Sequence, residues 1–408
     1  MTAPRASERG AVLVYVAVSM FVLIGVTTVV VDYGVMMVGR HQAQNSADAG
    51  ALAGAIALAY DDFDDRTDTG PAKQAAQGVA FANAVIGESP DVNITTDVTF
   101  PPCPNDGSNG CIRVDVYRNQ ARGNELPMFF GPTVGLTEQG VWATATARAA
   151  AANASDCMLP FGIPDKWIDY YDVDEPIEPE GSEAWTFPDD RFEIEDLDPP
   201  GATPDYYRAQ GTNSEDDVGT GFTLEEDLGQ LLVLKAAGPQ MTVAPGFFFP
   251  VRLPDSTGGN DYGDNIATCN GVPVAVDDLL DNEPGNMVGP TKMGMEALYD
   301  QDPNAELDFS DPDNPVIVNS CAQDDPPCAP QSPRLRPLIL FDTGVYYEGQ
   351  TNGLVELRVA NIIGFFIKEI SPDGEVSGYL MTLPGLFVEG GGTVAPGASF
   401  LYTIQLIR

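Results

Sequence analysis

The sequence predicts a single N-terminal transmembrane helix extended into a stalk, a small α+β unit, and a mostly β, sandwich-like C-terminal domain. Three observations predict this order. An uncharged apolar stretch lies near the N-terminus, a proline-free stretch rich in alanine follows it, and 42 glycines and 34 prolines divide the remaining chain into short segments. Such frequent breaks favour strands and turns over long helices. The 408 residues also exceed the usual size of one hydrophobic core, so we expect two folded units outside the membrane.

The expected segments, in chain order, are a cytoplasmic tail at 1–10, a transmembrane helix at 11–31, a juxtamembrane helix at 32–60, a small α+β domain at 61–156, and a β-rich domain at 157–408 with an acidic insertion at 165–227. The chain carries 20 basic and 60 acidic residues, which gives a formal net charge of -40. Such a field repels phosphate backbones, so nucleic acid is not an expected partner.

Residues 11–31 contain no charged side chain. At 1.5 Å per residue, a helix of this length spans roughly 31 Å, enough to cross the hydrocarbon core of a bilayer. Arg5 and Arg9 precede it, which places the N-terminus in the cytoplasm and the ectodomain in the periplasm or outside the cell. The cytoplasmic (inner) membrane is therefore the expected location. A cleaved signal peptide is the alternative, but the apolar run exceeds an h-region and A-x-A patterns begin only at Ala47.

Small residues recur at helical spacing in the proline-free segment 32–60. Alanines stand at every fourth position from 43 to 59, and Ser46 and two glycines form a second row beside them. Small side chains allow another helix to approach closely. The expected helix-packing interface consists of Ala43, Ala47, Gly50, Ala51, Gly54 and Ala55. The surface it meets is either a helix of a partner protein or the chain's own ectodomain, and the sequence leaves both alternatives open.

Residues 61–156 show the pattern of a small α+β unit. A helix is predicted at 71–86, and strands are predicted at 92–100, 111–117 and 141–147. In 112–117 the apolar residues alternate with charged ones, as in a strand with one buried face.

Six cysteines are an even number, which is typical of a disulfide framework in an oxidising compartment. The expected pairs are Cys103 with Cys111, Cys321 with Cys328 and, by elimination, Cys157 with Cys269. A metal site is a weaker interpretation, because neither close pair has CxxC spacing and His41 is the only histidine. We therefore expect no metal ligands.

Two acidic stretches, 172–180 and 261–265, raise the hypothesis of calcium binding, since hard cations prefer clustered carboxylate and carbonyl oxygens. Neither stretch has the spacing of an EF-hand or RTX loop. Acidic runs are usually solvated surface, and high external salt would explain the same charge. No other cofactor is expected.

The C-terminal part intersperses turns with apolar runs at 231–234, 337–341 and 400–407, which is typical of a sandwich. Three consecutive aromatic residues, 247–249, lie between Pro245 and Pro250. They fit either a buried short strand or an exposed loop that touches a target.

Three ordered pieces of the N-terminal segment carry a family resemblance: 9–17 (RGAVLVYVA), 31–34 (VDYG) and 44–55 (QNSADAGALAGA). Together they resemble the N-terminal module of the TadE/TadG-like family of Flp-pilus (tight adherence) assembly proteins. The resemblance implies a membrane-anchored role in pilus assembly, adhesion and biofilm formation, as a scaffold or minor-pilin-like subunit. It also implies that the N-terminal helix contacts other pilus-assembly proteins or pilins, and that the small α+β unit is pilin-like.

Two departures from the family pattern refine this expectation. Members processed as pseudopilins carry a glutamate at the fifth position after the cleaved glycine, and counting from Gly10 this position is Tyr15. Some TadG-like members carry a von Willebrand A domain whose metal loop reads Asp-x-Ser-x-Ser, and the string 308–312 fails at its last residue. The chain therefore resembles the TadG-related branch without a von Willebrand A domain.

No enzyme is expected. His41 is too near the membrane to serve as a base in the ectodomain, and the cysteines are expected to be oxidised. Asp342-Thr343-Gly344 resembles the turn of aspartic proteases, where two carboxylates share a proton, but the motif occurs once. The alternative to a pilus-assembly component is a membrane-tethered extracytoplasmic adhesin or ligand-binding module that uses the aromatic residues 247–249.

Overall fold

The computed structural model describes residues 9–407 except for 64, 105–106, 136–138, 169–191, 193–204, 212–216, 238–242, 285–286, 312–313 and 352–355. The chain forms two compact units. Unit 1 comprises Met1–Ala149 and Ile404–Arg408, and unit 2 comprises Ala150–Thr403. Unit 1 is thus discontinuous in sequence, and the whole of unit 2 lies between its two segments.

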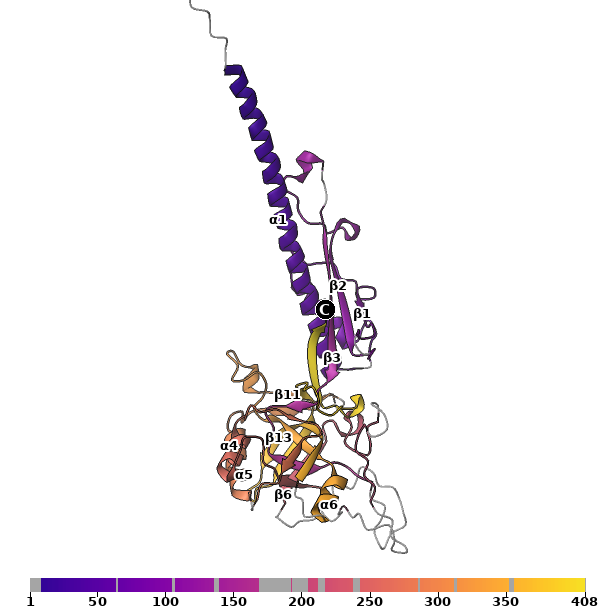
Figure 1. Ribbon diagram of the computed structural model, residues 1–408, viewed down its shortest axis with the longest axis vertical. Coiled ribbons are helices and arrows are strands. Elements are labelled where there is room, and N and C mark those ends of the chain that lie inside the picture. Colours follow the sequence, from indigo (N-terminus) through magenta and orange to yellow (C-terminus); the bar gives the residue numbers. More distant parts are fainter. Residues whose placement is uncertain are drawn as a thin grey trace, which may run out of the picture. The chain divides into compact units, whose positions relative to one another are not determined.

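Unit 1 consists of a very long helix, a short helix and an antiparallel sheet (Figure 1). Its elements are α1 (Arg9–Tyr60), α2 (Pro71–Ala82), β1 (Val98–Thr99), β2 (Cys111–Arg118), the 3-10 helices η1 (Gln120–Arg122) and η2 (Gly131–Val134), β3 (Val141–Ala151) and the end of β16 (Leu401–Ile407). The strands lie in the order β1-β2-β3-β16. Because α1 runs without a break from 9 to 60, the predicted transmembrane and juxtamembrane helices are one element.

Alternating residues of β2 and β3 build the sheet's buried face. Ile112, Val114 and Val116 are buried on β2, and alanines 143, 145 and 147 are buried on β3. The predicted strand at 92–100 contributes only β1. Its first half forms a turn instead, because Asn93 accepts from the N–H of Thr95 and donates its own N–H to Asp97. Side chains that bond nearby backbone groups compete in this way with a sheet ladder.

Unit 2 is mostly β, as predicted, but its main sheet is a closed barrel rather than a sandwich. Its strands are β4 (Ala154–Ser155), β5 (Phe161–Pro164), β6 (Leu231–Ala236), β7 (Phe247–Pro250), β8 (Val274–Ala275), β9 (Leu279–Asp281), β10 (Glu306–Asp308), β11 (Val316–Val318), β12 (Leu335–Phe341), β13 (Glu356–Ile370), β14 (Val376–Met381) and β15 (Leu383–Pro384). Its helices are α3 (Leu224–Asp227), α4 (Gly258–Ala267), α5 (Val288–Tyr299), α6 (Thr343–Thr351), η4 (Cys321–Gln323) and η5 (Pro396–Ala398).

The barrel follows the order β12-β5-β7-β6-β14-β13 and closes where β13 pairs with β12. Two of its pairings, β5 with β12 and β6 with β7, are parallel. A sandwich would need two separate sheets with free edges, whereas the 15-residue β13 is long enough to pair with β14, β12 and β9 in turn. Closure through β13 is the reason that the sandwich prediction was wrong.

The three aromatic residues 247–249 form most of β7 and contribute to the barrel core. Phe248 is fully buried and stacks on Phe161, with ring centroids 4.0 Å apart. Phe249 is also buried and meets Phe341 edge-on at 5.6 Å. Of the two interpretations of this stretch, the structure supports the buried strand, so these aromatics are not an exposed binding loop.

The six cysteines form the three predicted disulfides: Cys103–Cys111, Cys157–Cys269 and Cys321–Cys328. They enclose very different lengths of chain. The Cys157–Cys269 bond closes a loop with a sequence separation of 112 in unit 2, whereas the Cys321–Cys328 bond closes one with a separation of 7. A cross-link that closes a longer loop removes more entropy from the unfolded chain.

We expect the double substitution Cys157→Ser/Cys269→Ser to lower the free energy of unfolding of unit 2 by about 5 kcal/mol, and Cys321→Ser/Cys328→Ser by only about 2 kcal/mol. The difference follows from loop length alone, and both variants lose one disulfide. Denaturant titration of the purified full chain in detergent measures both values. Equal losses in the two variants would contradict this account.

Candidate functional site

The candidate site is α1, whose two halves have opposite surroundings. In its first half, the large apolar side chains that the structure describes from Val12 to Val31 are all exposed, including Leu13 at 73% and Phe21 at 79%. This stretch is long and apolar enough to cross a membrane. An uncovered apolar surface of this size is unfavourable in water and suits a lipid environment. The helix therefore fits a single-pass membrane protein.

The second half of α1 is covered by the folded part of unit 1. All six residues of the expected helix-packing interface are buried: Ala43, Ala47, Gly50, Ala51, Gly54 and Ala55. The elements that cover this half are α2 and β2. The structure thus places these residues against the chain itself, which is one of the two alternatives that the sequence left open.

The two glycines show how closely these elements approach α1. A Cβ atom added at Gly54 would lie 2.6 Å from the Cδ1 of Ile112 and 2.9 Å from the Cβ of Ala76. One added at Gly50 would lie 2.9 Å from the carbonyl oxygen of Ala76. These distances are shorter than van der Waals contact, so no larger residue fits without displacing α2 or β2.

Polar groups of α1 fix the position of the same contact. The buried Ser46 hydroxyl donates to the carbonyl of Ala80 on α2 at 2.9 Å. The Gln42 side chain accepts from the N–H of Ile86 at 2.7 Å, just beyond the end of α2. Gln44 donates to the carbonyl of Thr144 on β3 at 3.1 Å. Together they join α1 to both the helix and the sheet of unit 1.

Asp32 forms a contact that the sequence did not predict. Its buried carboxylate accepts three backbone hydrogen bonds, from the N–H of Phe129 at 2.9 Å, of Phe130 at 3.1 Å and of Gly131 at 2.6 Å. These amides lie at the start of η2, whose unpaired N–H groups favour an anionic partner. The Asp-aromatic-Gly motif in the sequence draws attention to Asp32. No nearby sequence feature predicts that its hydrogen-bond partners lie nearly a hundred positions away.

Asp342, in the turn that resembles an aspartic protease, has a structural role. It precedes α6, and its carboxylate accepts from the N–H of Val345 at 2.9 Å, which caps the helix. The same carboxylate pairs with Arg358. The Val345 N–H and Arg358 thus engage the carboxylate oxygens of Asp342, which in an aspartic protease would share a proton with a second carboxylate.

A second aspartate, Asp165, follows the neighbouring parallel strand β5. It accepts from the N–H groups of Lys166 at 3.0 Å and Phe222 at 3.1 Å, and from the Tyr207 hydroxyl at 3.3 Å. Among the described residues, no hydrogen bond joins its carboxyl group to that of Asp342. Burial raises the pKa of Asp165 to about 7, because the surrounding donors offset only part of the desolvation of the charged form.

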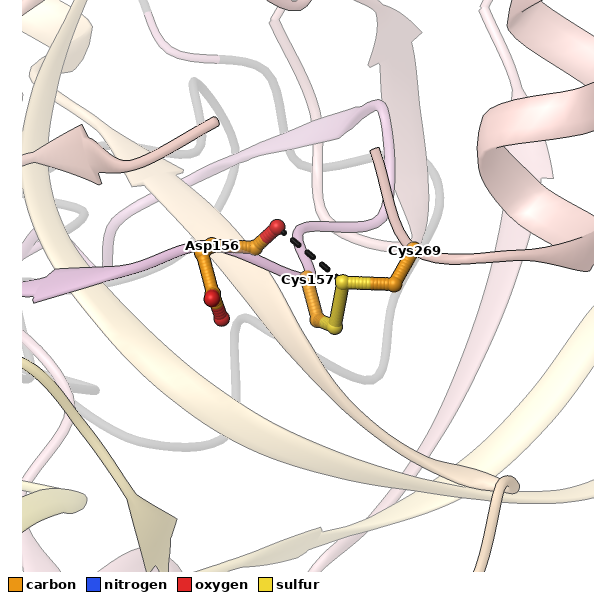
Figure 2. Close-up of side chains that lie close together, drawn as sticks. All are labelled: Asp156, Cys157 and Cys269. Atoms are coloured by element: carbon orange, nitrogen blue, oxygen red, sulfur yellow. Dashed lines mark hydrogen bonds between the residues drawn. A yellow bond between two sulfur atoms is a disulfide. The ribbon is translucent and has the colours of Figure 1, made fainter. Parts of the chain in front are cut away.

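One cluster of possible metal ligands occurs among the described residues (Figure 2). The carboxylate of Asp156 and the sulfurs of Cys157 and Cys269 lie within 4.8 Å of one another. Both sulfurs belong to a disulfide, so neither is a thiolate that could bind a metal ion. The backbone carbonyl of Asp156 approaches the Cys269 sulfur at 3.2 Å, and since a disulfide sulfur has no proton this is a polar contact only.

Of the two acidic stretches that raised the calcium hypothesis, the structure describes one. Residues 172–180 lie outside the described part of the chain, as does Pro312 of the string compared with the von Willebrand loop. Residues 261–265 lie within the helix α4 rather than in a loop. Asp261 there accepts from the N–H of Thr257 at 2.7 Å, at the start of that helix.

Comparison with known proteins gives a family for the N-terminal segment. Residues 10–57 match the family described as "Putative Flp pilus-assembly TadE/G-like", which confirms the resemblance carried by the N-terminal motifs. The matched segment coincides with α1, including both its exposed and its covered half. No curated protein and no solved structure matches the chain.

We expect Gly54→Leu to lower the free energy of unfolding of unit 1 by about 3 kcal/mol, because the side chain overpacks the contact with Ile112 and Ala76. Gly34→Leu is the matched control on the same helix, since a Cβ there meets no atom within 4 Å. We expect it to be neutral or slightly stabilising, because leucine is the better helix former. Thermal unfolding in detergent tests the pair, and similar losses in both would contradict the packing account.

We expect the stability of unit 2 to depend on the protonation of Asp165. Its folded pKa of about 7 lies above the ordinary value of 3.8, so its contribution to stability is fully present below about pH 4 and is lost as the pH rises through 7. The loss is on the order of 4 kcal/mol. Asp165→Asn should flatten the curve of unfolding free energy against pH between 4 and 8. An unchanged curve would show that Asp165 is ionised in the folded protein.

Proposed function

Since residues 10–57 form a TadE/G-like module, we propose that the chain is a non-enzymatic, membrane-anchored component of Flp/Tad pilus assembly. The observation that carries this proposal is that the family match and the single helix α1 coincide. One element thus supplies an apolar surface suited to lipid and a docking surface for the folded part of unit 1. Such a helix fits a scaffold or a minor-pilin-like subunit.

The proposed topology has the N-terminus in the cytoplasm and both units on the outer side of the inner membrane. Arg5 and Arg9 support this orientation. The three disulfides support an oxidising compartment. The pairing of a long helix with an antiparallel sheet in unit 1 is the feature that supports a pilin-like interpretation of that unit.

Partner helices are proposed to contact the exposed half of α1, because the small-residue interface already packs on α2 and β2. This half presents apolar side chains such as Val22 and Val26 around the uncrowded Gly25. Association of helices within a membrane depends on such close van der Waals contact. Calcium binding by the acidic surface remains a separate proposal that none of the described contacts supports.

Cross-linking in native membranes, followed by affinity purification of the full chain, tests this proposal. We expect wild-type protein to recover pilins or pilus-assembly proteins. A matched variant replaces residues 11–31 with an unrelated transmembrane helix of equal length and should lose most of these partners while remaining in the membrane. Recovery of no pilus protein by the wild type would overturn the proposal. Equal recovery by the wild type and the variant would indicate that the ectodomain, not residues 11–31 of α1, makes the contact.

Intact mass of the protein purified from membranes separates the two roles. A full-length chain supports a scaffold, since the anchor is retained unprocessed. Loss of the first ten residues, up to Gly10, would instead support a processed pilin-like subunit despite Tyr15. Thiol labelling under denaturing, non-reducing conditions adds a control, because three intact disulfides leave no cysteine to label.

A further inference from the structure

We propose that unit 1 touches the membrane at a second place, through residues 126–132, here named the clasp loop. The loop lies in the interfacial layer of the bilayer that α1 crosses, and the Phe129 side chain contacts lipid. Asp32 holds the loop at this level. This inference rests on the proposed single-pass anchor and adds a lipid-binding surface to it.

The position of Asp32 along α1 sets the depth of the loop. Asp32 directly follows the uncharged residues 11–31, which span roughly 31 Å as a helix, about the thickness of the hydrocarbon core. Its carboxylate therefore stands at the outer boundary of the hydrocarbon. Because the Phe129 N–H donates to this carboxylate at 2.9 Å, the loop lies at the same boundary.

The chemistry of the loop suits that position. Residues 126–137 contain no charged side chain, in a chain whose net charge is -40. Phe129 is 63% exposed, and Tyr33, next to Asp32 on α1, is 55% exposed. Aromatic residues are enriched where a membrane protein meets the headgroup layer. The two rings therefore offer lipid an aromatic surface on the loop and on the helix at one depth.

Backbone N–H groups of the loop are also hydrogen-bonded within the protein, which suits a medium poor in water. The N–H groups of 129–131 are bonded to Asp32, and that of Leu126 is bonded to a neighbouring carbonyl at 2.9 Å. Pro127 and Pro132 have no N–H group. Irregular backbone near hydrocarbon is tolerated only when such groups are satisfied internally.

Lipid is favoured over a partner protein as the occupant because the surface is continuous with the membrane-spanning half of α1. The large apolar residues described on α1 from Val12 to Val31 are exposed, and Asp32 joins the loop to the helix at the next position. The medium around the Val31 end of the membrane-spanning half of α1 therefore also surrounds Phe129. A protein cross-link at this position is the alternative outcome of the test.

The test replaces Phe129 with the photoreactive residue p-benzoylphenylalanine in the full chain, reconstituted in liposomes of phosphatidylcholine and phosphatidylglycerol. Phe21, within the span, is the positive control, and Phe81 on α2 is the negative control. Phe81 follows Ala80, which contacts Ser46 roughly 21 Å along α1 from Asp32. After irradiation, intact mass detects covalent lipid adducts.

We expect lipid adducts at positions 129 and 21 and none at 81. Adding Asp32→Ala should lower the adduct yield at 129 about fivefold and leave that at 21 unchanged, because the charge-assisted bonds that seat the loop are lost. Adducts at 21 but not at 129 would overturn the clasp-loop proposal and leave the anchor intact. No adduct at 21 would overturn the anchor and this inference with it. In native membranes, a protein rather than a lipid cross-linked to 129 would overturn lipid as the occupant.

Discussion

The close approach of α2 and β2 to α1 is the constraint on which the rest of unit 1 depends. Gly50 and Gly54 leave the space that lets the Ala76 backbone and the Ile112 side chain lie against α1. The Ser46 hydrogen bond to Ala80 can form only at that separation. A long helix that also supports a sheet needs a smooth surface where the sheet packs, and alanine, the best helix former, and glycine, the smallest residue, provide it.

The sequence predicts the elements of α1 well and their surroundings less well. Periodic small residues and an uncharged apolar stretch identify the helix, because both patterns follow directly from helical geometry. The same small residues pack equally well on a helix of a partner protein or on the chain's own α2. Their spacing therefore does not predict which of the two surfaces they contact. Asp32 shows the limit most clearly, since its partners 129–131 are distant in sequence and carry no polar side chain that would mark them.

In unit 2 the sequence predicts strands but not their order. The runs at 231–234 and 337–341 correspond to β6 and β12, because apolar residues between turns identify buried strands. Which strands pair depends on contacts far apart in the chain, such as the parallel pairing of β5 with β12. The Asp342 turn resembles a protease motif in the sequence and is a helix cap in the structure, because a strand followed by a helix needs such a residue for local reasons.

The interruption of unit 1 by unit 2 has a consequence for how the protein is made. Synthesis from the N-terminus produces α1, α2 and β1 to β3 first, but the strand that completes their sheet arrives only after all of unit 2. Until then the outer edge of β3 presents unpaired backbone groups, which are prone to pair with other chains. Unit 1 is therefore the last part of the molecule to be completed, and the edge of β3, rather than the barrel, is where pairing with other chains has to be avoided.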